Sequence, residues 1–217
     1  QNCSYREDPS LFTLVYAYPR ISIPIILAVS MALLSLLLGI LLVHSRKTKE
    51  IRVMSETDAL TGLYNRRAAE DHISRQMQED GKNPDCVRPL ISIDLDKFKQ
   101  VNDTYGHLEG DALLIAVADT LRTSVRSYDI VGRIGGDEFV VYLSNVTDRQ
   151  NAMAVAEKLC QVIRGLSTMK KEWSNISASI GISFADHPDI KMEELYISAD
   201  KAMYSAKGNG RDQYQTL

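Results

Sequence analysis

The chain contains little cysteine, little tryptophan and little net charge. Its 217 residues include 3 cysteines and 1 tryptophan, and the formal net charge is −3 at pH 7. Cys3, Cys86 and Cys160 are too few and too scattered for a disulfide framework or a zinc site, so we expect ordinary reduced or buried thiols. Broad nucleic-acid binding usually needs a basic face, which a mildly acidic chain does not favour. We therefore expect no nucleic acid among its partners.

The rest of the composition is that of a globular domain with something apolar attached. Hydrophobic residues make up 45% of the chain and charged residues 24%, and the length allows about one domain and a short appendage. The first residue is Gln1 rather than an initiator methionine. We therefore expect a fragment or a processed chain, with a larger N-terminal sensor region missing from it.

The apolar appendage is residues 21–43, ISIPIILAVSMALLSLLLGILLV, which contain no charged side chain. As a helix this run would be about 34 Å long, enough to cross the apolar core of a bilayer, where the backbone must pair within the segment. A cleaved signal peptide is the alternative, but its apolar core would be only about 7–15 residues long. The sequence therefore predicts a transmembrane helix over 21–43, after an extracytoplasmic stub at 1–20.

The charges that flank this run predict its orientation. Four basic residues follow it closely: Arg46, Lys47, Lys49 and Arg52. Because positive residues are enriched on the cytoplasmic side, we expect a single-pass protein of the inner (cytoplasmic) membrane, with residues 44–217 in the cytoplasm. Within that part we predict a linker helix at 44–56 and a folded domain at 57–217.

The predicted domain mixes strands and helices. Residues 90–95, LISIDL, alternate and predict a half-buried strand with Ser92, Asp94 and Asp96 on its polar face. Residues 130–134 and 138–143 predict a β-hairpin joined at glycines. We also expect strands at 177–184 and in the last six residues, and helices at 66–79, 97–102, 109–125, 148–164 and 193–206. Thr57 or Asp58 is a candidate helix N-cap and Gly208 a candidate C-cap.

A direct hairpin among alternating strands and helices favours an α+β fold over a fully parallel nucleotide-binding fold. In such a fold Asp94 ends one strand, and Asp137 and Glu138 lie at the hairpin tip. If strand and hairpin are neighbours, three carboxylates converge and repel one another unless a cation neutralises them, and Mg²⁺ prefers carboxylates with substrate phosphates. Two such ions could activate a hydroxyl and stabilise a leaving phosphate. The alternative is solvated acids at a turn.

Four motifs give these acids a context: GGDEF at 135–139, DALTGLYNRR at 58–67, DLDKFKQVNDTYGHLEGD at 94–111 and ADKAMYSAKGNGR at 199–211. Together they resemble the GGDEF-domain diguanylate cyclases over about residues 57–214. The resemblance implies a palm-like mixed sheet flanked by helices, of the nucleotide-cyclase and polymerase-palm type. It also implies condensation of two GTP into cyclic di-GMP with release of two pyrophosphates. The resemblance further implies that the active form is a homodimer, with one GTP bound to each domain, and that it needs Mg²⁺ or Mn²⁺.

The resemblance implies roles for the acids and glycines. Asp94 and Asp137 match the metal-binding acids, assisted by the backbone carbonyl of Leu95. Glu138 matches the second signature acid, as a base or as a metal partner. The turn Gly135-Gly136 and the backbone of Phe98 and Lys99 should approach the ligand closely, which a Cβ at the glycines would hinder.

Further matches concern the substrate. In the family that the motif resembles, Asn102 and Asp111 match the guanine-reading pair. The chemistry fits this role, because a carboxylate accepts from the N1–H and N2–H₂ donors of guanine and an amide can bond O6 or N3. Turn and capping roles are the alternative. The resemblance also bears on the product: family members that make mixed cyclic dinucleotides tend to have a different residue at this position, so Asp111 favours a product made from guanine nucleotides alone. Two basic residues match phosphate contacts, Lys207 and Arg211, although Lys207 could instead complement the helix dipole. His107 lies in the same motif, as a helix cap or a ligand contact.

A last match concerns control. Arg126 and Asp129 fit the family's RxxD inhibitory site, six positions before Gly135, and Arg133 is expected to help bind the cyclic product there; a helix-end ion pair is the simpler alternative. A membrane-anchored diguanylate cyclase is thus the leading hypothesis. A catalytically silent receptor for GTP or cyclic di-GMP is the second, and a membrane adaptor that only dimerises is the third.

Overall fold

The computed structural model describes residues 19–185, 187 and 189–217, and the chain divides into two compact units at Val53 and Met54. The first unit holds most of helix α2, Pro19–Glu56. The predicted span and the predicted linker helix are therefore one continuous helix. Within it, Ile23–Leu41 has a mean hydropathy of 2.6 and is long and apolar enough to cross a membrane. The predicted stub lies, up to residue 18, outside the described residues.

The second unit is built on a six-stranded mixed sheet in the order β1-β3-β4-β2-β5-β6. The central pairs are antiparallel, whereas β1 pairs with β3 and β5 with β6 in parallel. This confirms the α+β class with a mixed sheet. The strands are β1 (Tyr64–Asn65), β2 (Pro89–Asp96), β3 (Ile130–Gly135), β4 (Glu138–Tyr142), β5 (Ser177–Phe184) and β6 (Gln213–Thr216).

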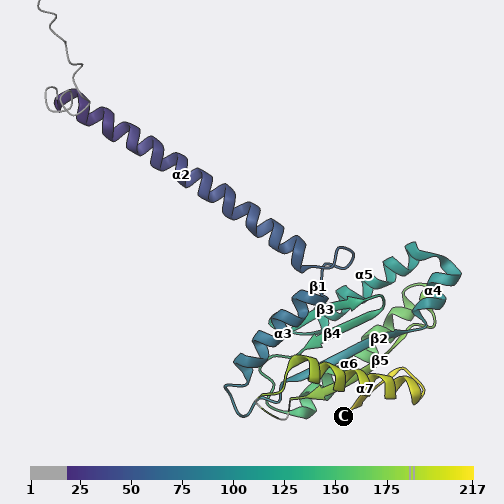
Figure 1. Ribbon diagram of the computed structural model, residues 1–217. Coiled ribbons are helices and arrows are strands. Elements are labelled where there is room, and N and C mark those ends of the chain that lie inside the picture. Colours follow the sequence, from purple (N-terminus) through teal and green to yellow (C-terminus); the bar gives the residue numbers. More distant parts are fainter. Residues whose placement is uncertain (1–18, 186, 188) are drawn as a thin grey trace, which may run out of the picture. The chain divides into compact units, whose positions relative to one another are not determined.

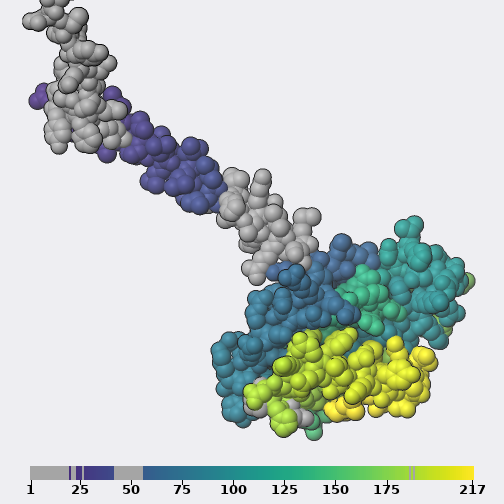
Figure 2. Space-filling view, in the orientation of Figure 1, coloured from purple at the N-terminus to yellow at the C-terminus, as the bar shows by residue number. Residues whose placement is uncertain are grey.

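Helices cover both faces of this sheet (Figure 1). They are α3 (Arg66–Asp80), α4 (Phe98–Tyr105), α5 (His107–Ser124), α6 (Arg149–Gly165) and α7 (Met192–Gly208), with 3₁₀ turns at Leu166–Thr168 and Lys171–Trp173. Helices α5 and α6 pack on one face, and α3 and α7 on the other. Figure 2 shows α3 in blue and α7 in yellow-green side by side on the domain surface.

Strand β2 is buried along its whole length, so the prediction of a half-buried strand is wrong. Ile91 and Ile93 join the core under α5 and α6, while Leu90 joins the core under α3 and α7. On that second side the Ser92 hydroxyl lies 3.5 Å from the sulfur of Met203 in α7. Alternation thus marks two differently covered faces, and both faces are buried.

The predicted caps also need correction. Asp58 caps no helix, because its Oδ1 accepts from the Thr61 N–H at 2.9 Å and from the Thr61 hydroxyl at 2.7 Å, closing a turn. Helix α3 begins later and is capped by Asn65, while Gly208 is the last residue of α7 rather than its cap. The described thiols, those of Cys86 and Cys160, are free and buried as expected, and Cys3 lies outside the described residues.

Candidate functional site

The predicted acids meet where β2 ends beside the tip of the β3–β4 hairpin. Strands β2 and β4 are antiparallel neighbours, and Asp94 lies directly opposite Glu138. The Leu95 N–H donates to the Asp137 carbonyl oxygen at 3.3 Å. Cross-strand partners point to the same face of a sheet, so the Asp94 and Glu138 side chains both project toward the α3 and α7 side. The condition set by the sequence, that strand and hairpin be neighbours, is met.

Burial and like charge disfavour ionisation at this point. Burial raises the pKa of Asp94, the Lys207 ammonium lowers it, and the nearby Asp137 and Asp96 carboxylates raise it further. Burial also raises the pKa of Glu138, with added repulsion from Asp94, from Asp200 of α7 and from Asp137. A carboxylate cluster of this kind favours a cation.

In the structure the cation is the Lys207 side chain. Its Nζ lies 2.7 Å from Asp94 Oδ2, and the two side chains are 29% and 12% exposed. Within residues 19–185, 187 and 189–217, no group of three or more His, Cys, Asp or Glu side chains is arranged to hold a metal ion. The three acids are therefore neighbours in register and in charge but not a preformed three-carboxylate cage. The oxygen donors of Asp94, Leu95 and Asp137 still suit a hard divalent cation, which would displace the ammonium.

The glycine turn of the hairpin is open and firmly held. Gly136 has φ of 53°, a left-handed conformation that favours glycine, and a Cβ at Gly135 or Gly136 would meet no atom within 4 Å. Arg133 donates to the Gly136 carbonyl through Nη2 at 2.8 Å and Nε at 3.1 Å, and its Nη1 lies 3.0 Å from Asp58 Oδ1. Arg66 Nε donates to the Ile134 carbonyl at 3.2 Å. Two arginines thus fix the backbone on either side of a turn whose outer surface is free.

The predicted base-reading residues lie on two helices joined at Gly106. Asn102 is in α4 and Asp111 in the second turn of α5, and the Asn102 amide lies against Gly110, the neighbour of Asp111. His107 is the exposed first residue of α5. The structure therefore places the Asn102 side chain beside the residue that precedes Asp111, and Asp111 itself is exposed.

The start of α4 offers donors of its own. Phe98 and Lys99 are its first residues, and the preceding Lys97 makes no side-chain cap. The first N–H groups of a helix have no partner within the helix and attract anions. This is compatible with the predicted approach of a phosphate to the Phe98–Lys99 backbone.

Asp96 lies beside the predicted site, although no sequence motif gives it a role. It is 3% exposed, and its carboxylate accepts from the hydroxyls of Ser177 and Ser179, both at 2.7 Å, and from the Asp212 N–H at 3.1 Å. These bonds fix the turn that presents Arg211, whose Nε lies 3.7 Å from Asp96 and whose side chain is 55% exposed. The available signal was the alternation that puts Asp96 on the same face as Asp94.

The predicted inhibitory site is divided by the structure. The Asp129 carboxylate accepts from the N–H groups of Arg126 at 2.8 Å and Ser144 at 3.0 Å. Burial raises the pKa of Asp129 and has a larger effect than these bonds, which lower it. A cavity of about 620 Å³ adjoins Arg126 and Asp129 and is also lined by Lys158. Arg133 is not brought there, because its guanidinium is bound at the opposite end of β3.

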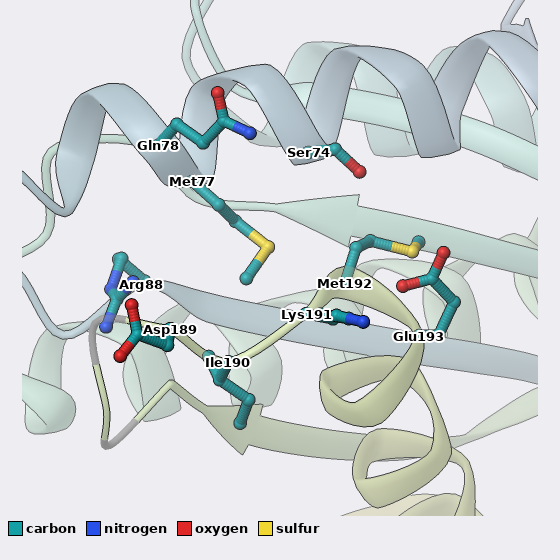
Figure 3. A pocket seen from close by; sticks show the side chains of 9 residues that line it. All are labelled: Ser74, Met77, Gln78, Arg88, Asp189, Ile190, Lys191, Met192 and Glu193. Atoms are coloured by element: carbon teal, nitrogen blue, oxygen red, sulfur yellow. The ribbon is translucent and has the colours of Figure 1, made fainter.

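A separate cavity of about 340 Å³ lies at the start of β2, away from the acids (Figure 3). Met77 of α3 and Met192 of α7 point into it, and Arg88 and Asp189 lie at one side. Arg88 donates to the carbonyls of Ala185 at 3.2 Å and His187 at 2.7 Å. Arg88 therefore holds the loop after β5 in place, and this cavity is separate from the site of Asp94, Asp137 and Glu138.

Curated relatives carry the same domain. The chain is 39% identical over 170 residues to the bifunctional diguanylate cyclase/cyclic di-GMP phosphodiesterase MucR of Pseudomonas aeruginosa, covering 78% of this chain and 24% of the relative. It is 34% identical over 175 residues to the diguanylate cyclase DgcS of Shewanella oneidensis, covering 80% of this chain and 57% of that protein. The chain thus spans less than two thirds of these relatives.

Solved structures agree on the fold, and a family model agrees on the sequence. The coiled coil and GGDEF domain of DgcB from Caulobacter crescentus, in complex with c-di-GMP, has a TM-score of 0.73 at 24% identity, covering 90% of this chain and 100% of that one. The diguanylate cyclase SiaD of Pseudomonas aeruginosa, in complex with its activator SiaC, has a TM-score of 0.67 at 27% identity, covering 95% and 80%. Residues 55–213 match the family described as "Diguanylate cyclase, GGDEF domain". The chain therefore belongs to the GGDEF domain family of diguanylate cyclases.

Proposed function

We propose that this chain is a diguanylate cyclase that joins two GTP molecules into cyclic di-GMP and releases two pyrophosphates. The observation that carries the proposal is the pairing of Asp94 with Glu138 across β2 and β4, beside a glycine turn with open space around it. Support comes from relatives that are named diguanylate cyclases and from a related GGDEF domain solved with c-di-GMP.

The reaction forms two phosphodiester bonds and breaks two phosphoanhydride bonds. The 3′-hydroxyl oxygen of each GTP attacks the α-phosphorus of the other, which forms two phosphodiester bonds. The two bonds between α- and β-phosphate break, and two pyrophosphates and two protons leave. Because each domain binds one GTP, the two reacting centres meet only when two copies face each other, and the active form is a homodimer.

The acids serve the reacting phosphates. The carboxylates of Asp94 and Asp137 and the carbonyl of Leu95 would hold Mg²⁺ or Mn²⁺, and the bound ion would act as a Lewis acid on the α-phosphate and on the attacking hydroxyl. Burial and the neighbouring carboxylates raise the pKa of Glu138. This residue completes the site as a proton acceptor or as a further oxygen ligand. Arg66 and Arg133 keep the turn in place through the Ile134 and Gly136 carbonyls.

The remaining residues bind and orient the nucleotide. Asn102 and Asp111 read the guanine edge, and His107 flanks them. Lys207, once released from Asp94, and the exposed Arg211 offset the charge of the triphosphate, together with the N–H groups of Phe98 and Lys99. Gly135 and Gly136 leave room for the phosphates because they carry no side chain.

The cyclic product inhibits the enzyme by binding at Arg126 and Asp129, where a cavity of about 620 Å³ adjoins both residues. Arg133 contributes to the catalytic turn instead. Helix α2 anchors the chain in the inner (cytoplasmic) membrane, and the domain lies in the cytoplasm where GTP is available. The long apolar stretch Ile23–Leu41 and the basic residues after it support this arrangement.

The test is a product assay. The full chain, purified in a mild detergent and supplied with GTP and Mg²⁺, should release cyclic di-GMP and pyrophosphate, as measured by HPLC. Asp137→Ala should abolish turnover, while Asp85→Ala, which removes an exposed acid from a loop before β2, should not. Nucleotide binding without turnover by the unaltered chain would reject the enzyme in favour of a silent receptor, and an active Asp137→Ala would reject the metal assignment.

A further inference from the structure

We infer that Gly110 is a positioning residue that sets where the Asn102 amide stands, and through it which nucleobase the domain accepts. The inference rests on the proposed function, because it takes Asn102 as a guanine contact. Gly110 is buried in α5, and Asn102 reaches it from α4 across the bend at Gly106, whose φ is 86°. The role of Gly110 would be to carry no side chain, because the Asn102 amide occupies the space where a Cβ would lie.

The contact leaves no room for a methyl group. A Cβ built on Gly110 would lie 1.9 Å from Asn102 Oδ1, 2.8 Å from its Cγ and 3.3 Å from its Nδ2. All three nearest atoms belong to this one side chain. An alanine at position 110 and the present Asn102 rotamer therefore exclude each other.

The side chain, and not the fold, should give way. Within the part of the chain that the structure describes, no hydrogen bond or ion pair ties the Asn102 side chain to another residue. Gly181 is the contrast, because a Cβ there would lie 1.9 Å from the Ala199 carbonyl oxygen and 2.2 Å from the Met203 nitrogen, both backbone atoms of α7. Alanine also suits a helix interior better than glycine does. Gly110→Ala should thus keep the domain folded.

The displacement is large on the scale of a hydrogen bond. Moving Oδ1 from 1.9 Å to the ordinary contact distance of 3.4 Å shifts the amide by about 1.5 Å. A hydrogen bond does not survive such a shift, because its heavy-atom distance varies by only a few tenths of an ångström. For base specificity, we take the amide contact as one to O6, because guanine presents the O6 acceptor where adenine presents an amino donor, whereas both purines carry N3. Losing that contact should weaken guanine binding more than adenine binding.

The experiment measures binding without turnover. The probes are 3′-deoxy-GTP and 3′-deoxy-ATP, which lack the attacking hydroxyl, titrated calorimetrically into the full chain in the presence of Mg²⁺. The variants are Gly110→Ala, Asn102→Ala, the double variant and the control Gly165→Ala. Gly165 is the last residue of α6, and a Cβ there would meet nothing within 4 Å.

We expect Gly110→Ala to weaken 3′-deoxy-GTP binding about tenfold, one hydrogen bond's worth, and to lower the preference over 3′-deoxy-ATP. Asn102→Ala should do the same, and the double variant should bind no more weakly than Asn102→Ala alone, because the clash needs the amide. Gly165→Ala should bind as the unaltered chain does. The thermal midpoint of Gly110→Ala should not fall.

Three results would overturn the inference: unchanged binding by Gly110→Ala, a loss in the double variant that adds to that of Asn102→Ala, or an unfolded Gly110→Ala protein. Each would mean that Gly110 does not act through the Asn102 side chain. The proposed activity fails by a different result, the absence of cyclic product from GTP. These outcomes are separate, because the 3′-deoxy probes report binding whether or not the domain turns over.

Discussion

Replacing Lys207 with methionine should make the domain depend on a divalent cation for its stability. The Lys207 ammonium is the group that balances Asp94, at 2.7 Å, in a cluster where Asp137 and Glu138 add negative charge. Methionine keeps much of the apolar stem but removes the charge. Asp94 then stays buried among other carboxylates with no positive partner, unless an added cation takes the place of the ammonium.

The magnitude follows from the burial of the pair. A hydrogen bond to a charged group contributes about 1.5–3 kcal/mol, and solvent at the Lys207 end, which is 29% exposed, lowers this to about 1.5 kcal/mol. For a domain of this size the thermal midpoint should fall by roughly 3–6 °C without metal. Mg²⁺ should recover more of the midpoint in the variant than it adds to the unaltered chain, because it no longer competes with the ammonium.

The assay uses the single tryptophan of the chain, Trp173, which is 5% exposed and reports unfolding by fluorescence. Melts are run in EDTA and in millimolar Mg²⁺. Lys82→Met is the matched control, because its ion pair with Glu79 is 2.6 Å long but both partners are more than half exposed. Equal Mg²⁺ responses in Lys207→Met and the unaltered chain, or no loss of stability in EDTA, would refute the reasoning.

Three further predictions concern other parts of the domain. Arg126→Ala should raise the cyclic di-GMP concentration needed for inhibition about tenfold or more, whereas Arg133→Ala should lower the initial rate and leave inhibition intact, as measured by pyrophosphate release. Tyr142→Phe should lower the free energy of unfolding in urea by about 2 kcal/mol, because the buried Tyr142 hydroxyl donates to Asp80 Oδ2 at 2.9 Å. Asp129→Asn should gain stability relative to the unaltered chain as pH rises above 3.8, the ordinary Asp value, in thermal melts at several pH values.

The sign of the last prediction comes from burial, which raises the folded-state pKa of Asp129. The folded chain then holds the proton more tightly than the unfolded chain, so this contribution is complete below the ordinary pKa and is lost as pH rises through the folded value. A pH-independent difference between the two proteins would contradict it.

Tyr105→Phe, at an exposed tyrosine, is the control for Tyr142→Phe, and equal losses of stability in the two variants would exclude the bond to Asp80 as the cause. Loss of inhibition in Arg133→Ala would return that residue to the product site.

Much of the fold was accessible from the sequence because its strands are short and strongly patterned. The alternation in 90–95 and the glycines between two apolar runs predict β2 and the β3–β4 hairpin within a residue or two. Burial of both faces of β2 was not accessible, since it depends on α7 lying over Ser92 and on α5 and α6 covering Ile91 and Ile93. Strand β1, two residues long, is too short to show any period.

The candidate site was accessible as a set of residues but not as a set of contacts. Motifs single out Asp94, Asp137 and Lys207, yet the choice of Lys207 to pair with Asp94 depends on where α7 ends relative to β2. Arg133 shows the same limit. Because Arg133 lies near the RxxD string, the sequence suggested that it binds the cyclic product. In the structure its guanidinium instead bonds to Asp58, 75 residues earlier in the chain. Such choices are made in three dimensions, where spacing along the chain carries no information.

The bond between Asp58 and Arg133 has a practical consequence for protein engineering. Asp58 follows the end of α2 at Glu56 by two residues, and its carboxylate supports the arginine that holds the Gly136 carbonyl. A shortened chain that starts after Asp58 would thus lose a support of the Gly135-Gly136 turn, although the GGDEF motif at 135–139 would still be complete. A soluble version of the domain should therefore begin at or before Glu56, and a chimera that replaces helix α2 should be joined there.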